Sequence, residues 1–166
     1  LTVEEILIKS GNIGSVKIGQ LLEAKKLKGF LEKIGVINKI EFDIEEVGAP
    51  IPFKWGPCEL ATASYGHGIT TTPLQLAKGY AIISNGGYEI RPTLIKTEKS
   101  NKKIKRRILK ENVSKNINHI LRKIVTSEEG TAGQANVLGY EIGGKTGTAQ
   151  KVKNGSYSKA KINTFA

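Results

Sequence analysis

The sequence predicts an α+β fold in which helices pack on an antiparallel sheet. Apolar residues recur at helical spacing through most of the first half of the chain, whereas residues 141–165 alternate in the way of strands. Helices and strands do not alternate regularly, which disfavours a doubly wound parallel sheet. With 166 residues, 39% of them hydrophobic, the chain is long enough for one core. Residues 1–166 are therefore expected to be part of one domain.

Three helical segments are predicted before residue 36. The first covers residues 2–9 and opens with a capping box between Thr2 and Glu5. After a polar break at 10–12 a second segment follows, and a third runs from about 24 to 34 and ends at Gly35, a residue suited to a left-handed cap. The apolar faces of the second and third segments are expected to consist of Ile13, Val16, Leu21 and Leu22, and of Leu27, Phe30, Leu31 and Ile34.

The middle of the chain is predicted to contain one helix and one strand. Residues 36–57 are expected to be irregular, because three prolines block long helices there. Thr72 and Pro73 are typical of an N-cap and a first-turn proline, and the helix that they start is apolar enough to be buried. Residues 85–87 should end it, and 88–97 resemble a strand with Pro92 at an edge or irregularity.

The last part of the chain predicts a helix and a hairpin. Residues 111–126 have the clearest amphipathic pattern of the sequence. Residues 141–165 predict two strands joined by a polar turn at Asn154-Gly155. The apolar face of the helix is expected to consist of Val113, Ile117, Ile120, Leu121, Ile124 and Val125.

Lysine and arginine outnumber aspartate and glutamate by 26 to 15, a net charge of +11. Such an excess fits an anionic partner, such as nucleic acid, an acidic membrane surface or an acidic polymer. A compositional bias toward Lys, Ile and Asn explains it as well. The densest basic run, 99–110, contains no aromatic residue, although base-stacking platforms need them. Nucleic acid is therefore disfavoured, and the run is expected to be a solvated loop or a lysine-protected edge strand.

The sequence predicts no metal site, cofactor or disulfide. Cys58 is the only cysteine and is expected to pack near Trp55, while His67, in a loop, and His119, on a helix, have no metal-ligand spacing. No apolar run approaches the roughly 20 residues that span a bilayer. A membrane anchor or signal is therefore expected outside these residues.

Residues 143–148, Gly-Gly-Lys-Thr-Gly-Thr, are the most informative stretch. At a strand edge, Lys145 and Thr146 can hold a carboxylate through one ammonium and one hydroxyl group. Gly147 leaves the backbone bare, so that a ligand can lie against the strand and pair with it. Backbone amides left unpaired there can stabilise a developing oxyanion.

The same lysine completes a phosphate-loop pattern, G-x-x-x-x-G-K-T, that begins at Gly139. A phosphate loop requires a helix directly after it, so that the amides at the helix end meet the phosphate. Residues 148–152 instead look extended, and the match lies too late in the chain for the parallel strands that should follow. Nucleotide binding is therefore the disfavoured alternative.

Ser10-Gly11-Asn12 alone predicts no more than a polar break between helices, but its position before Lys145-Thr146-Gly147 matters. Penicillin-binding proteins and serine β-lactamases carry Ser-x-x-Lys, Ser-Asp-Asn and Lys-Thr-Gly motifs, and here the second precedes the third by a domain-scale distance. Nearly the whole chain resembles the class B penicillin-binding proteins, most closely the cell-division (septal) type. The resemblance extends over residues 55–77, 84–87, 130–132 and 144–150.

This resemblance implies the penicillin-binding protein/serine β-lactamase-like fold and a peptidoglycan D,D-transpeptidase activity. Ser10 would help to pass a proton to the leaving group, and Asn12 would orient side chains and the substrate amide. Lys145 and Thr146 would bind the terminal carboxylate, and the Thr148 N–H would supply half of an oxyanion hole. The resemblance thus assigns catalysis to Ser10, Asn12 and Lys145 and substrate binding to Thr146, Gly147 and Thr148.

The nucleophile of this family belongs upstream of Ser10, where only nine residues stand. Two Ser-x-x-Lys matches, at 100–103 and 156–159, lie downstream and are within what chance gives in a lysine-rich chain, so neither is assigned a role. The chain also stops at Ala166, in a predicted strand. The fold is therefore expected to be incomplete at both ends, and these residues alone are expected to be inactive.

The resemblance also implies partners and a location. The expected ligands are stem peptides ending in D-Ala-D-Ala and the β-lactams that mimic them, and the expected partners are divisome proteins and a glycosyltransferase. The expected place is the periplasmic side of the bacterial inner membrane. A D,D-carboxypeptidase or β-lactamase and a penicillin-sensing receptor domain are the related alternatives.

Overall fold

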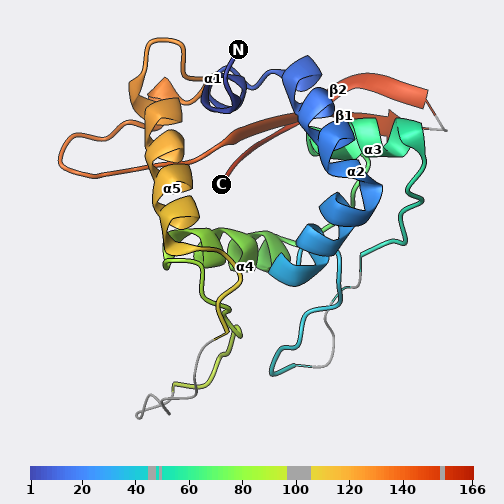
Figure 1. Cartoon of the computed structure of the whole chain (residues 1–166), viewed down its shortest axis with the longest axis horizontal. Coiled ribbons are helices and arrows are strands. Elements are labelled where there is room, and N and C mark those ends of the chain that lie inside the picture. The colour runs from blue at the N-terminus through green and yellow to red at the C-terminus, as the bar shows by residue number, and fades with distance from the viewer. Residues whose placement is uncertain (45–47, 49, 97–105, 154–155) are drawn as a thin grey trace.

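The computed structural model describes residues 1–44, 48, 50–96, 106–153 and 156–166. The helices α1, α2, α4 and α5 form a closed ring of contacts, α1 with α2, α2 with α4, α4 with α5 and α5 with α1 (Figure 1). One antiparallel hairpin completes the chain, which confirms the α+β class. The elements are α1 (Val3–Ile8), α2 (Asn12–Ile34), α3 (Pro57–Ser64), α4 (Pro73–Ser84), α5 (Glu111–Thr126), the 3-10 helix η1 (Gly133–Ala135), β1 (Thr146–Lys153) and β2 (Ser156–Phe165).

The start of α1 has the predicted capping box. The Glu5 N–H donates to Thr2 Oγ1 at 3.2 Å, and the Thr2 N–H donates to the Glu5 carboxylate at 2.6 Å. The helix ends before Ser10, whose backbone φ of +54° lies in the left-handed region. The break predicted at 10–12 is confirmed for Ser10 and Gly11, whereas Asn12 is already the first residue of α2.

The two predicted segments after this break are joined into α2 with a kink between them. Glu23 has non-helical backbone angles, φ +63° and ψ 159°, inside the helix. Gly35 ends α2 with φ +80°, as predicted, in a conformation that glycine adopts without steric cost.

The apolar face predicted for the first half of α2 is wrong. Ile13 and Leu21 are 77% and 82% exposed. The buried position is Gly19, where any Cβ would collide with the Ser64 side chain of α3. Close approach of α2 and α3 through a glycine, and not burial of large side chains, therefore orients this half of the helix.

The helix α3 is not among the predicted elements, and it contains Cys58. Pro57 occupies its first turn, where the missing N–H costs nothing. Cys58 follows it and is exposed, so the prediction that it packs near Trp55 is wrong. The Trp55 ring instead meets Phe53 edge to face, with centroids 4.9 Å apart.

The helix α4 confirms its predicted start and end. Thr72 and Gln75 form a capping box, and Gln75, fully buried, also donates to the carbonyl of Asn38. Asn85 ends the helix by accepting hydrogen bonds from the next turn. Ile82 is fully buried, although the helix is covered on one face and not all round.

The strand predicted at 88–97 is wrong for the described part of that segment. Tyr88 alone pairs, in an isolated bridge with Arg107, whose guanidinium lies over the tyrosine ring. Further on, the Asp43 carboxylate accepts the Thr93 hydroxyl at 2.6 Å and the Leu94 N–H at 2.7 Å, which takes the place of a ladder partner. Thr97 and most of the basic run 99–110 lie outside the described residues.

The predicted helix at 111–126 is confirmed as α5, and it connects two small cores. Ser114 and Asn118 both donate to the Ile83 carbonyl of α4, the second at 3.2 Å. Lys123 of α5 pairs with Glu4 of α1 at 2.5 Å. The two cores are formed by Ile8, Ile124, Val125 and Ala132, and by Ile34, Ile82 and Leu109.

The predicted hairpin is confirmed, although it begins at Thr146 and not at 141. Thr146 stands opposite Phe165, Gly147 opposite Thr164 and Thr148 opposite Asn163, with an irregularity after Gln150. The turn predicted at 154–155 lies outside the described residues.

Two kinds of feature are absent from the described residues. No helix among them is long and apolar enough to cross a membrane. In that same part of the chain, no three His, Cys, Asp or Glu side chains group closely enough to hold a metal ion.

Replacement of Ile82 by alanine tests the importance of the α4 core. Ile82 is fully buried, so the cavity should lower the free energy of unfolding by about 2–5 kcal/mol. The matched control is Leu138→Ala, at a fully exposed leucine, which should change it by less than about 0.5 kcal/mol. Denaturant unfolding measures both, and similar losses for the two variants would contradict the assigned core.

Candidate active site

The two motifs singled out in the sequence meet in space. Lys145 Nζ donates to Ser10 Oγ at 2.7 Å, across 135 positions of the chain. Ser10 lies at the sharp bend between α1 and α2, where its left-handed backbone turns the chain. Such a conformation is uncommon for a residue with a side chain and is often kept at functional sites.

The helix α5 determines where Lys145 lies. The Gly144 N–H, just before it, donates to the Leu121 carbonyl of α5 at 3.1 Å. Lys145 itself pairs with Ala166, N–H to carbonyl at 2.8 Å and the reverse at 3.2 Å. A Cβ on Gly144 would stand 2.7 Å from the Ala166 carbonyl oxygen, so only glycine allows this approach.

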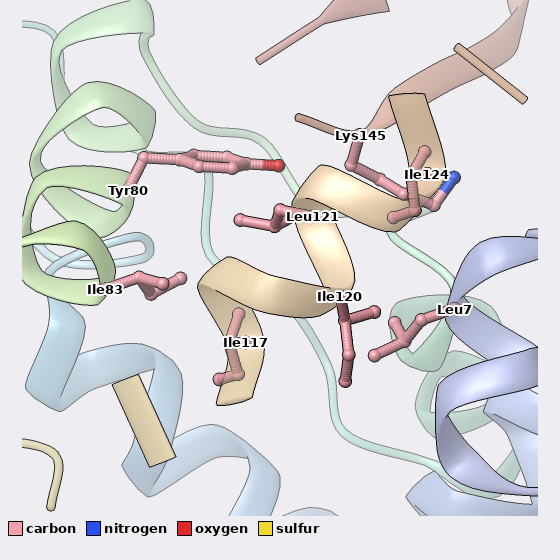
Figure 2. A pocket seen from close by; sticks show the side chains of 8 residues that line it. All are labelled: Leu7, Tyr80, Ile83, Ile117, Ile120, Leu121, Ile124 and Lys145. Atoms are coloured by element: carbon pink, nitrogen blue, oxygen red, sulfur yellow. The ribbon is translucent and has the colours of Figure 1, made fainter. Parts of the chain in front are cut away.

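The Lys145 side chain is half-buried at the edge of an apolar pocket of about 140 Å³ (Figure 2). Burial lowers the pKa of Lys145, because the charged form loses solvation. Its ammonium donates to neutral oxygens, Ser10 Oγ, the Thr146 carbonyl at 3.0 Å and Thr146 Oγ1 at 3.5 Å. The other residues that line the pocket come from α1, α4 and α5 and are Leu7, Tyr80, Ile83, Ile117, Ile120, Leu121 and Ile124.

A lysine whose pKa is lowered can exchange a proton with a neighbouring hydroxyl more readily than an ordinary one. The same ammonium, when charged, can bind a carboxylate together with a hydroxyl group. The arrangement of Lys145, Ser10 and Thr146 can therefore serve both proton transfer and anion binding. This combination suits acyl transfer to or from a substrate that ends in a carboxylate.

Thr131 is a member of this cluster that the sequence did not assign. Its Oγ1 lies 2.7 Å from Thr146 Oγ1. The segment 130–132 belongs to the resemblance described above, but the tripeptide carries no chemistry that distinguishes it in one sequence. Spatial proximity is the signal that identifies it.

The remaining predicted site residues lie near the cluster without joining its hydrogen bonds. Asn12 is exposed in the first turn of α2, two positions after Ser10. Gly147 is half-buried, and a Cβ there would stand 2.6 Å from Thr164 Oγ1. Thr148 is exposed on β1, opposite Asn163.

The phosphate-loop alternative is contradicted by the strand that follows the lysine. β1 begins at Thr146, so no helix end meets a phosphate at this point. The downstream Ser-x-x-Lys matches also remain without a role. Residues 100–103 lie outside the described residues, and the other match, at 156–159, belongs to β2.

Comparison with known proteins points to one family. The family model described as the penicillin binding protein transpeptidase domain matches residues 1–166. The chain is 37% identical to stage V sporulation protein D of Bacillus subtilis, over 94% of this chain and 26% of that protein. It is 33% identical to the probable peptidoglycan D,D-transpeptidase FtsI of Caulobacter vibrioides, over 91% and 26%. The chain thus spans about a quarter of the length of these two relatives.

A solved structure agrees with this relationship. The apo TP domain of penicillin-binding protein 3 from Burkholderia pseudomallei superposes with a TM-score of 0.89 at 29% identity. The match covers 99% of this chain and 51% of that one. The described fold is therefore that of part of such a domain.

The lowered pKa of Lys145 can be tested against Lys9, whose pKa is raised because its ammonium bonds Glu129 at 2.8 Å. Lys145 should lose its proton at a lower pH than Lys9. Because its folded pKa lies below the unfolded value, its protonation opposes folding, and that cost should disappear as the pH rises through the folded pKa toward the usual lysine range. An NMR titration of the lysine side chains shows which of the two loses its proton first, and the Lys145→Arg variant identifies the Lys145 signal. Titration of Lys145 at the same pH as Lys9 would refute the lowered pKa.

Proposed function

The chain belongs to the class B penicillin-binding protein transpeptidase family, and on that premise we propose that it forms the substrate-holding part of a peptidoglycan D,D-transpeptidase. The observation that carries the proposal is the 2.7 Å hydrogen bond from Lys145 to Ser10, which unites the two family motifs. The resemblance of the sequence motifs to the cell-division (septal) type makes a role in the septal wall part of this proposal.

In the proposed reaction, a serine hydroxyl attacks the carbonyl carbon between the two terminal D-alanines of a stem peptide. The C–N bond breaks, the terminal D-alanine leaves with a proton, and the peptide remains as a serine ester. The amine of a second stem peptide then attacks the ester, forms the cross-link and returns the proton to the serine. β-Lactams enter the same first step, and their ester persists.

The contacts of Ser10, Lys145 and Thr146 support their proposed roles, whereas the role proposed for Asn12 rests on the family motif. Ser10 relays the proton to the leaving amine, and the neighbouring Lys145 adjusts the proton affinity of the Ser10 hydroxyl. Lys145 and Thr146 bind the terminal carboxylate, and Asn12, two positions after Ser10, orients the substrate amide.

The strand β1 is the proposed platform for the substrate backbone. Within the described residues, β1 pairs with β2 on one edge only, so a peptide can align along the other edge at Gly147. The Thr148 N–H then contributes to the oxyanion hole. Small, bare backbone at Gly147 allows this approach.

The nucleophile is proposed to lie outside residues 1–166, upstream of Ser10. The chain spans about a quarter of the length of two relatives, and a membrane anchor outside residues 1–166 and action on the outer side of the inner membrane are also part of the proposal. Divisome proteins and a glycosyltransferase are the proposed partners. None of these features is needed for the contacts around Lys145.

Penicillin labelling tests the function and the place of the nucleophile together. The full-length protein should be labelled covalently by a fluorescent penicillin, and its sequence should contain Ser-x-x-Lys before Ser10. Residues 1–166 alone should not be labelled. Absence of label on the full-length protein would refute the function, whereas label on the shorter chain would refute only the place of the nucleophile.

Replacement of Lys145 by alanine should slow acylation of the full-length protein by about 10²–10³-fold, because it removes both the proton partner of Ser10 and the carboxylate-binding charge. Lys151→Ala is the matched control, since Lys151 is exposed on the same strand. Its acylation rate should stay within about twofold of the unchanged protein. Equal effects of the two substitutions on the rate of penicillin labelling would contradict the assignment.

A further inference from the structure

We propose that Thr131 is a positioning residue that directs the Thr146 hydroxyl toward the carboxylate of the ligand. This inference rests on the proposed function and adds a group to its carboxylate-binding site. The contact behind it is the 2.7 Å separation of Thr131 Oγ1 and Thr146 Oγ1, from segments 15 positions apart.

The backbone on both sides of Thr131 is fixed by the end of α5. The Ala132 N–H donates to the Ile124 carbonyl at 3.2 Å, and the Gly130 N–H donates to the Ser127 carbonyl at 3.0 Å. Ile124 is among the last four residues of α5, whose carbonyls lack partners within the helix, so Ala132 supplies one. Ala132 is buried, and a Cβ on Gly130 would overlap the Ile124 carbonyl. An exposed threonine therefore stands on a rigid support.

Thr146 depends on the same helix. Gly144, two positions before it, bonds the Leu121 carbonyl, which is less than one helical turn from Ile124. Both threonines are thus anchored to neighbouring carbonyls of α5. The distance between their hydroxyls is determined by a helix and not by a mobile loop.

The number of protons and lone pairs explains what this contact does. A threonine hydroxyl has one proton and two acceptor lone pairs. Lys145 Nζ, 3.5 Å from Thr146 Oγ1, occupies one lone pair, because an ammonium can only donate. If Thr131 donates to the second, the single proton of Thr146 is left for a third direction. A carboxylate, which only accepts, is the ligand group that such a proton fits.

Without the Thr131 hydroxyl, Thr146 keeps its oxygen but loses this constraint. Its hydroxyl can then rotate toward other acceptors and must be reoriented when a carboxylate binds. The resulting loss of acylation rate should appear only with ligands whose carboxylate is free. A general loosening of the site would instead slow all ligands alike.

Acylation of the full-length protein by benzylpenicillin and by its methyl ester separates these effects. Thr131→Val should lower the second-order acylation rate constant for benzylpenicillin by about three- to tenfold, the loss expected for one hydrogen bond. For the ester, the loss should be below about twofold, since its carboxylate is masked. Thr131→Ser, which keeps the hydroxyl, should restore the benzylpenicillin rate.

The matched control is Thr126→Val. Thr126 is also exposed, and its hydroxyl bonds the Arg122 carbonyl of α5, away from Thr146. Both rate constants should be unchanged in this variant. Rates are taken from the time course and normalised to the labelled amount, so a smaller folded fraction lowers the amplitude and leaves the rate constant readable.

Two results would overturn the inference while the proposed function stands. One is an unchanged benzylpenicillin rate in Thr131→Val, and the other is an equal loss with both ligands. A failure of the unsubstituted protein to react with benzylpenicillin would overturn the proposed function and the inference together.

Discussion

The hydrogen bond from Lys145 to Ser10 is the interaction on which the arrangement of the site depends, because it joins the beginning of the chain to its end. Both residues are held in position for this hydrogen bond by contacts with α5. The helix α1 leads to Ser10 and is held on α5 by the Glu4–Lys123 ion pair, and Lys145 is held there through Gly144. An exposed ion pair alone contributes little, so the apolar contacts of Ile8 with Ile124 and Val125 must supply most of this attachment. The helix α5 is thus the common support of two motifs that lie 135 positions apart in the sequence.

The chemistry of Lys145 follows from a balance between burial and hydrogen bonding. Removing an ammonium from water is costly, and no carboxylate among the described residues bonds Lys145 directly to offset that cost. The hydrogen bonds of its ammonium in that part of the chain go to two hydroxyls and a carbonyl. Partial exposure keeps the cost moderate, so the pKa is lowered while the group remains in the site. A carboxylate partner within the protein would have stabilised the charge and occupied the place of a ligand. The apolar wall formed with Leu7 and Ile124 therefore contributes to the lowered pKa of Lys145 as well as to the fold.

Local signals in the sequence predicted local features of the structure. The capping box at Thr2, the N-cap at Thr72, the glycine end of α2 and the periodicity of α5 depend on neighbours within a few positions, and all are confirmed. The wrong predictions concern features that depend on contacts between segments far apart in the sequence. Ile13 and Leu21 in the first half of α2 are exposed because Gly19 makes the contact with α3. The segment after Tyr88 is held by Asp43 instead of a strand. The same limit applies to the site, since the motifs identified Lys145 and Ser10 but only the folded chain places Thr131 against Thr146.

The hairpin shows why the informative residues cluster at its base. Among the described helices and strands, β1 and β2 contact only each other. The hairpin is attached to α5 by the residues just before it, Gly143 and Gly144. The position of β1 is therefore defined at its first residues, where Lys145 pairs with Ala166, and becomes less constrained along its length. A group that must hold a ligand within a few tenths of an ångström belongs at the anchored end, since precision decays with distance from the support. Exposed lysines farther along the strands, such as Lys151 and Lys161, add positive charge without that precision, and the net charge of the chain consequently says little about its site.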